Sequence, residues 1–403
     1  MPITTLERLP AAARPTWVEI HIDRLAHNFR AIRARVGEGV KICAVVKAEA
    51  YGHGAVAVAH SLEAVGADWF GVAAVEEAIA LREAGIARPI LCFGVARGQE
   101  ALVLEHRLTP VVFDVAQIER LDACARARRA ILDVHLEVDT GMGRTGVPLR
   151  ELETILKAFE RFRHVRLDGL MTHLAAADDP AQEEFTRAQI ARFHEAVRVV
   201  ETRGFHPTYR HLANSAGVRA YPEAWGNMVR PGGLLYGLWS GPRPSAPSSR
   251  AEIVIETPMG EYAMQPVLSL HTRIVFLKEV EAGTPLGYGS TFVTARRSRI
   301  ATLPIGYHDG YRRALSDRGR VLVRGRFAPV VGRVSMDWTL VDVTDIPDAR
   351  VGDEVILIGQ ADGQRITAEE LAELCGTISY ELTCGIGARV PRVLVSASES
   401  ALG

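Results

Sequence analysis

The feature that most constrains the fold is an alternation of short apolar runs and helical segments up to Val229. Runs such as Ile42 to Val46 are rich in β-branched and small apolar residues, which is typical of strands buried on both faces. Helical segments such as 182–203 separate them, and strands alternating with helices indicate βαβ units and a parallel sheet. The predicted strands are 16–22, 42–46, 69–73, 90–93, 111–113, 131–138, 167–171, 209–212 and 227–229.

Nine strand signals are one more than an eight-stranded barrel needs. We therefore predict an N-terminal (β/α)8 TIM-type barrel over residues 16–239, with residues 1–22 pairing with a second domain. Asp23 is expected to cap the first helix, whose apolar residues fall on one face.

The second domain begins after a segment rich in proline and serine. Residues 240–262 are interpreted as a linker, which either shapes the active-site entrance or is a plain surface loop. Beyond it, strand signals separated by glycine-containing turns predict a mostly β domain over 263–403, with one strand expected at 330–334.

Composition narrows the range of partners. A chain of 403 residues is long enough for about two domains, and its net charge of -1 offers no basic field for nucleic acid. No long apolar run predicts a membrane span or signal peptide, so we expect a cytoplasmic protein that binds a small molecule. The cysteines lack metal or redox spacing and are interpreted as reduced thiols; they are Cys43, Cys92, Cys124, Cys375 and Cys384.

Lys47 directly follows the apolar run 42–46. In a parallel α/β barrel, ligands bind at this end of the strands, where loops and helix N-termini supply N–H groups. A lysine in such a place has its pKa lowered by desolvation and can form a Schiff base. The plain alternative for Lys47 alone is a surface lysine after a core strand.

The segments around Lys47 resemble a known family. Ala44-Val45-Val46-Lys47-Ala48 and Ala50-Tyr51-Gly52-His53-Gly54 are similar to the pyridoxal-phosphate signature of the alanine racemase family. The resemblance extends from Thr16 to Arg392. It implies pyridoxal 5'-phosphate as cofactor and interconversion of L- and D-alanine through an external aldimine, supplying D-alanine for peptidoglycan. It also implies a homodimer with shared active sites.

The resemblance implies which residues bind the cofactor. Lys47 would carry it, and Arg230 would face the pyridine nitrogen with His211 behind it. Because arginine cannot accept a proton, that nitrogen should stay unprotonated, which restrains side reactions. The remaining cofactor-binding residues implied are Tyr51, His173, Asn214, Ser215, Gly232, Gly233 and Tyr380.

Racemisation needs one proton to leave one face of a planar intermediate and another to arrive on the opposite face. By resemblance Lys47 serves one face, and Tyr288, from the partner subunit, serves the other. A tyrosine has a pKa near 10, so a cationic neighbour is required, for which Arg144 and His173 are candidates. Arg144 is also implied in substrate binding, together with Met336 of the segment that contains Asp337.

Two positions depart from the family pattern. Glu137 stands where many members carry a lysine that becomes carbamylated, and we hypothesise that its carboxylate orients Arg144. Glu49 replaces an amide often found in the signature.

Three other functions were weighed. A non-catalytic pyridoxal-phosphate carrier would lack the β domain. A decarboxylase of this architecture would place a carboxylate, not Arg230, at the ring nitrogen. A broad-specificity amino acid racemase of the same family stays open, because it differs from an alanine racemase only in its pocket.

Overall fold

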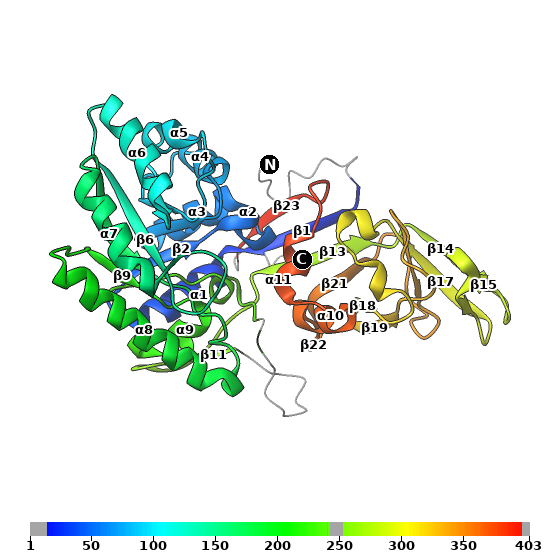
Figure 1. Ribbon diagram of the computed structural model, residues 1–403. Helices are drawn as coiled ribbons and strands as arrows, with labels where there is room; N and C mark the ends of the chain where they lie inside the picture. The colour runs from blue at the N-terminus through cyan, green and yellow to red at the C-terminus, as the bar shows by residue number, and fades with distance from the viewer. Residues whose placement is uncertain (1–13, 240, 242–252, 397–403) are drawn as a thin grey trace.

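The computed structural model describes residues 14–239, 241 and 253–396. It consists of a barrel wrapped in helices and a mostly β domain, joined through strand β1 (Figure 1). This arrangement confirms the predicted fold class. Among the helices in the described residues, none combines the length and the apolar composition that crossing a membrane requires.

Eight parallel strands form the barrel, and neighbours pair in the order β10-β2-β3-β4-β5-β6-β8-β9. Backbone hydrogen bonds from Asn227 N to Arg210 O and from Arg230 N to Ala213 O join β9 to β10 and the loop after it. The strands are β2 (Lys41–Val45), β3 (Trp69–Val72), β4 (Ile90–Cys92), β5 (Thr109–Val112), β6 (Leu132–Asp139), β8 (Val165–Met171), β9 (Tyr209–His211) and β10 (Met228–Val229).

Helices surround the barrel because each strand presents alternate apolar residues outward as well as inward. Buried Trp69, Leu91, Val111 and Met228 belong to a separate cluster that also contains Cys43 and Met171. The helices are α1 (Ile22–Val36), α3 (Ala55–Ala64), α4 (Val75–Glu83), α5 (Glu100–Glu105), α6 (Val115–Ala127), α7 (Leu152–Arg161), α8 (Glu183–Thr202) and α9 (Ser215–Ala220).

Strand β1 (Thr16–His21) belongs to the second domain although it leads directly into α1. It lies between β13 (Leu268–Arg273), antiparallel, and β23 (Arg392–Val395), parallel. The other strands of this sheet are β21 (Glu354–Ala361), β18 (Arg320–Val323), β19 (Arg326–Pro329) and β22 (Gln364–Ile366).

A second sheet, of β14 (Phe276–Val280), β17 (Ser298–Leu303) and β20 (Thr339–Asp342), lies with the hairpin β15 (Pro285–Leu286) and β16 (Phe292–Val293) at the end of the domain away from the barrel (Figure 1). Helices α10 (Ala368–Cys375) and α11 (Ser379–Cys384) lie nearer the barrel.

Three sequence predictions need correction. Helix α1 begins at Ile22, so Asp23 lies in its first turn and is not the cap. The strand expected at 330–334 is only a single bridge from Val330 to Val341, beyond β19. Part of the expected linker, whose positions 240 and 242–252 lie outside the described residues, forms a hairpin of β11 (Val254–Thr257) and β12 (Gly260–Ala263), because its residues alternate around a turn.

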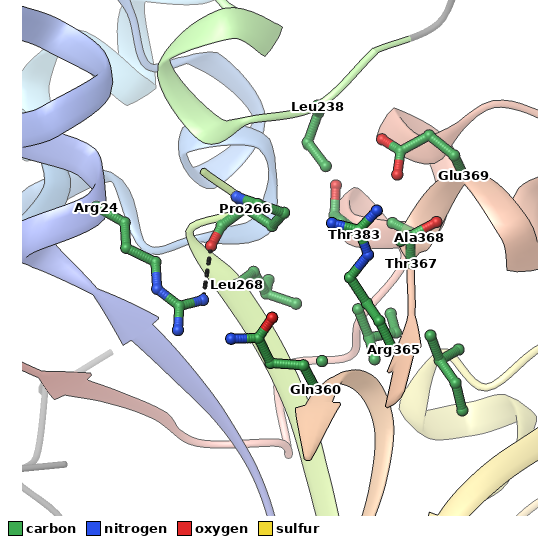
Figure 2. A pocket seen from close by; sticks show the side chains of 13 residues that line it. Arg24, Leu238, Pro266, Leu268, Gln360, Arg365, Thr367, Ala368, Glu369 and Thr383 are labelled. Carbon is green, nitrogen blue, oxygen red and sulfur yellow. Dashed lines mark hydrogen bonds between the residues drawn. The ribbon is translucent and has the colours of Figure 1, made fainter. Parts of the chain in front are cut away.

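A small cavity of about 40 Å³ lies where the two domains meet, between α1, β21 and α10. Figure 2 shows Arg24 of α1 donating a hydrogen bond to the carbonyl of Pro266 beside it. A space of this size holds only a few waters, so it is no site for a cofactor.

Candidate active site

A cavity of about 450 Å³ opens at the carboxyl ends of the barrel strands, the end where barrel ligands bind. Its volume lies within the range of small-molecule sites. Of the residues predicted from the sequence, its lining contains Lys47, Tyr51, Glu137, Arg144, His173, Asn214, Ser215, Arg230, Gly232, Gly233 and Tyr380.

Lys47 is presented by a turn of unusual backbone conformation, the segment labelled α2 (Lys47–Gly52). Ala48, Glu49, Ala50 and Tyr51 all have φ between 53° and 56°, which is the left-handed region. Non-glycine residues pay roughly 1–2 kcal/mol each for that conformation. Four in succession require support from the surrounding structure.

Glu77 on α4 supports the start of this turn. Its carboxylate accepts hydrogen bonds from the amides of Ala48 (2.6 Å), Ala73 (2.7 Å) and Ala74 (3.2 Å). The Ala48 amide directly follows Lys47, so one side chain connects the lysine's backbone to the loop after β3.

Gly52 and Glu49 fix the other end of the turn. A Cβ on Gly52 would lie 2.1 Å from the carbonyl oxygen of Thr383, so only glycine allows α11 to pack here. The Glu49 Oε2 atom accepts a hydrogen bond from the Ala55 amide (3.2 Å) at the start of α3. The glutamate that departs from the family signature therefore satisfies a helix N-terminus.

Burial lowers the pKa of Lys47 below its ordinary value, and the positive charge of Arg144 lowers it further. Both effects disfavour the ammonium form. The neutral amine, which is the nucleophile, is thereby made more available.

Arg230 lines the cavity and is only 3% exposed. It donates hydrogen bonds to the carbonyl oxygens of Thr172 (2.7 Å), His211 (2.9 Å) and Leu212 (3.2 Å), and to Nδ1 of His211 (2.7 Å). Burial lowers its pKa to about 10, so the guanidinium remains a cation at neutral pH. The structure thus pairs Arg230 with His211 directly.

Glycines and tyrosines form a close-packed cradle at one side of the cavity. A Cβ on Gly232 would lie 2.3 Å from the Tyr51 hydroxyl, and one on Gly233 would lie 2.1 Å from the Tyr380 hydroxyl. Ser215 Oγ accepts from the amide of Gly232 at 2.9 Å. Two phenol hydroxyls and the Ser215 hydroxyl thus converge on this glycine backbone, and hydroxyl donors of this kind suit an anion.

Asn214 has a structural role at the edge of this cradle. Its Oδ1 accepts from the Gly217 amide (3.0 Å) and caps α9, while its Nδ2 donates to the carbonyl of Leu174 (3.1 Å). Ser215, the first residue of α9, is thereby held towards the cavity.

Glu137 does not form an ion pair with Arg144 in the described part of the chain. Its Oε2 accepts a hydrogen bond from the Thr145 hydroxyl (2.8 Å). Any effect of Glu137 on Arg144 therefore acts through charge or through this neighbouring residue. Burial, Arg230 and Arg144 lower the pKa of His173 to about 3, so of the two cationic candidates only Arg144 carries a charge.

Tyr288 and Met336 are not among the described residues that line this cavity; both lie in the β domain. Tyr288, two residues after the end of β15, is 74% exposed, and Met336 is 51% exposed. The Met336 carbonyl accepts from the His308 amide (3.1 Å), and Asp337 accepts from Arg389 (2.6 Å), which fixes the loop.

Comparison with known sequences gives matches in both parts of the chain. Residues 20–240 match the family model described as alanine racemase, N-terminal domain, and residues 267–394 match alanine racemase, C-terminal domain. The alanine racemase of Syntrophobacter fumaroxidans is 45% identical over 373 residues, covering 92% of this chain and 95% of the relative. That of Symbiobacterium thermophilum is 46% identical, covering 94% and 97%. The chain belongs to the alanine racemase family.

Solved alanine racemases have the same architecture. The enzyme from Streptomyces lavendulae superposes with a TM-score of 0.87 at 32% identity, covering 97% of this chain and 100% of that one. The enzyme from Bartonella henselae, with covalently bound pyridoxal phosphate, superposes with a TM-score of 0.80 at 28% identity, covering 94% and 99%. The resemblance identified from the sequence is confirmed.

Sequence reasoning within this alanine racemase fold missed two residues behind the cavity. Glu77 could have been found because a glutamate at the third helical position often bonds back to the amides before the helix. His135 precedes Glu137 by two positions on β6, and residues two apart share a strand face. Only the tertiary structure shows that His135 meets His211.

Proposed function

We propose that this chain is an alanine racemase that interconverts L- and D-alanine with pyridoxal 5'-phosphate attached to Lys47. The observation that carries the proposal is one cavity uniting an amine of lowered pKa, the buried cation Arg230 and the glycine–tyrosine cradle. The family supports the reaction, and the covalently bound cofactor of the Bartonella henselae relative supports the cofactor.

The residues present fit this cofactor. Lys47 would hold its aldehyde carbon, and the backbone of Gly232 and Gly233 with Tyr51, Ser215 and Tyr380 would hold its phosphate. Approach of the phosphate to the backbone requires the missing Cβ atoms of the two glycines.

Arg230 would face the pyridine nitrogen. The guanidinium of Arg230 can only donate hydrogen bonds. The pyridine nitrogen facing it would therefore accept and carry no proton. When bound, pyridoxal phosphate supplies a conjugated ring that takes up the electron pair left at the α-carbon.

Two groups of the protein would move the proton. The Lys47 amine holds a proton at Nζ on one face of the substrate, and the Tyr288 hydroxyl of a second copy does so on the other. Arg144 lines the cavity, and its charge would hold the substrate carboxylate and stabilise the phenolate of Tyr288. Met336 of the second copy would contact the same carboxylate through its backbone.

A homodimer is part of the proposal, because Tyr288 lies in a groove of the β domain that one chain leaves open. The groove has a volume of about 770 Å³ and includes the exposed rings of Phe276, Tyr288 and Trp338. Exposed apolar patches of this kind mark interaction sites. A second copy would cover the groove and bring Tyr288 to the other chain's cavity.

The cellular role proposed is supply of D-alanine for peptidoglycan in the cytoplasm, as is usual for the family. The direct test is the Lys47→Ala variant, loaded with pyridoxal phosphate and assayed for conversion of L-alanine. Loss of the visible absorbance of lysine-bound cofactor together with loss of activity is expected. The control Lys157→Ala, exposed on α7, should keep both. Retained absorbance in Lys47→Ala would contradict the assignment.

A further inference from the structure

Arg230 is the end of a hydrogen-bonded chain that runs into the barrel interior. Nη1 of Arg230 lies 2.7 Å from Nδ1 of His211, and Nε2 of His211 lies 2.8 Å from Nδ1 of His135. Both histidines are fully buried, with 0% exposure. The chain thus extends from the active-site cation to a residue that does not line the cavity.

The direction of every bond follows from Arg230. A guanidinium only donates, so Nδ1 of His211 must accept and carry no proton. The proton of the neutral His211 ring is then on Nε2 and is donated to Nδ1 of His135. His135 in turn carries its own proton on Nε2. Both rings are neutral, because burial and the Arg230 charge lower the pKa of His135 to about 3 and that of His211 well below its ordinary value.

The barrel holds the His135 ring tightly. The pairing of β6 with β8 shifts register between Val134 and His135, and a Cβ on Gly169 of β8 would lie 2.4 Å from the ring. The rings of Trp69 and Tyr209 lie 5.5 Å and 5.6 Å away between centroids. The ring therefore has little freedom to turn its Nδ1 away from His211.

This placement has a cost. Among the described residues, Nε2 of His135 has no hydrogen-bond partner, although it is buried. An unpaired buried polar group costs about 1–3 kcal/mol, and an apolar side chain would avoid that loss. A buried group left in this state calls for a reason other than packing.

We propose that His135 is a positioning residue: by accepting from Nε2 of His211 it stabilises the tautomer that Arg230 requires, in which Nδ1 of His211 accepts from the guanidinium. The last step, the alignment of Arg230 with the pyridine nitrogen, rests on the proposed function. Without His135 the Nε2–H of His211 loses its acceptor, so the other tautomer, whose Nδ1–H opposes the N–H of Arg230 and displaces the guanidinium, becomes less unfavourable.

Two variants with side chains of similar shape separate the effect of the hydrogen-bond acceptor at position 135 from the effect of side-chain volume. His135→Asn keeps an oxygen acceptor near the position of Nδ1, whereas His135→Leu has the same branched shape and no acceptor. Both lose the ring and the contacts of Trp69 and Tyr209. If the two variants differ in the His211 tautomer or in kcat, the hydrogen bond to His211 is responsible. If they do not differ, only the packing of His135 matters.

The primary readout is nitrogen NMR of the protein labelled with ¹⁵N-histidine, before any cofactor is added, with His211 assigned by its loss in His211→Gln. In the wild type and in His135→Asn, Nδ1 of His211 is expected unprotonated and Nε2 protonated. In His135→Leu, Nδ1 should become protonated in part or fully. After loading, kcat of His135→Leu should fall about five-fold to ten-fold below that of His135→Asn, with little change in KM, since one neutral hydrogen bond is lost.

Two results would overturn the proposal. One is a protonated Nδ1 of His211 in the wild-type protein, which needs no variant. The other is an identical His211 tautomer and kcat in the two variants. Failure of the proposed function is distinguishable, because a wild-type protein that does not racemise alanine leaves the tautomer measurement intact.

Discussion

The amide nitrogen of Ala48 lies 2.6 Å from Oε1 of Glu77. This bond joins the residue after Lys47 to helix α4 and stabilises the first of four consecutive left-handed residues. Since Lys47 is among the described residues that line the cavity and Glu77 is not, we expect Glu77 to influence the lysine's position from outside the cavity.

Glu77→Gln should lower the free energy of unfolding by roughly 1–3 kcal/mol, because a charged acceptor of three amides is replaced by a group with one acceptor. It should also slow capture of pyridoxal phosphate by Lys47. Thermal denaturation and stopped-flow absorbance measure the two effects. The neighbouring Glu76→Gln is the control, since Glu76 bonds at the surface to Gln99. Equal stability of the two variants would show that the turn does not depend on Glu77.

Variants of Glu137 and Thr145 separate the effect of the Glu137 charge from the effect of the hydrogen bond between the two side chains. Glu137→Gln removes the charge and keeps an acceptor for Thr145, whereas Thr145→Val removes the bond and keeps the charge. If the charge of Glu137 acts on Arg144, Glu137→Gln should raise KM for alanine about three-fold to ten-fold and Thr145→Val should raise it less. Steady-state kinetics measure both. Unchanged kinetics in Glu137→Gln would refute the hypothesis that this carboxylate orients Arg144.

The pH dependence of cofactor capture reports the pKa of Lys47. Only the neutral amine attacks the aldehyde, so the rate should rise with pH and level off above that pKa. Because Arg144 lowers the pKa, Arg144→Leu should raise it and move the midpoint to higher pH. Capture rates at a series of pH values measure the midpoint. An unmoved or lower midpoint in Arg144→Leu would contradict the proposed coupling.

The proposed sharing of active sites between two subunits predicts complementation. Lys47→Ala and Tyr288→Phe should each be nearly inactive alone. A mixed dimer has one site with Lys47 from one chain and Tyr288 from the other, both intact. Equal amounts unfolded and refolded together should regain roughly one quarter of wild-type activity, if the chains pair at random. No regain, with mixed dimers demonstrated by mass spectrometry, would place both residues of a site in one chain.

Much of the barrel was predictable because each strand is a short apolar run that needs burial on both faces. Lys47 was found for the same reason, since it ends such a run. The left-handed turn after it was not predictable, because Ala48 and Tyr51 give no local signal for positive φ. The hydrogen bond from its first amide goes to Glu77, and Thr383 of α11 packs against Gly52 at its other end; both are distant in sequence.

The inner contacts of the site were predictable only in part. His211 was expected behind Arg230, and in the structure its Nδ1 atom is hydrogen-bonded to the Arg230 guanidinium. The position of His135 requires knowledge of strand register, because the pairing of β6 with β8 shifts by one residue of β8 between Val134 and His135. The placement of Tyr288 and Lys47 in separate pockets of one chain agrees with the two predicted domains, although only the resemblance, and no local pattern, implied it.

The central claim is tested most directly by incubating the purified protein, loaded with pyridoxal phosphate, with L-alanine, L-serine, L-lysine and L-arginine separately. Chiral chromatography then measures each D-enantiomer. We predict fast formation of D-alanine and little turnover of the larger amino acids. Comparable turnover of lysine or arginine would indicate a broad-specificity racemase, and no D-alanine from protein with bound cofactor would contradict the account.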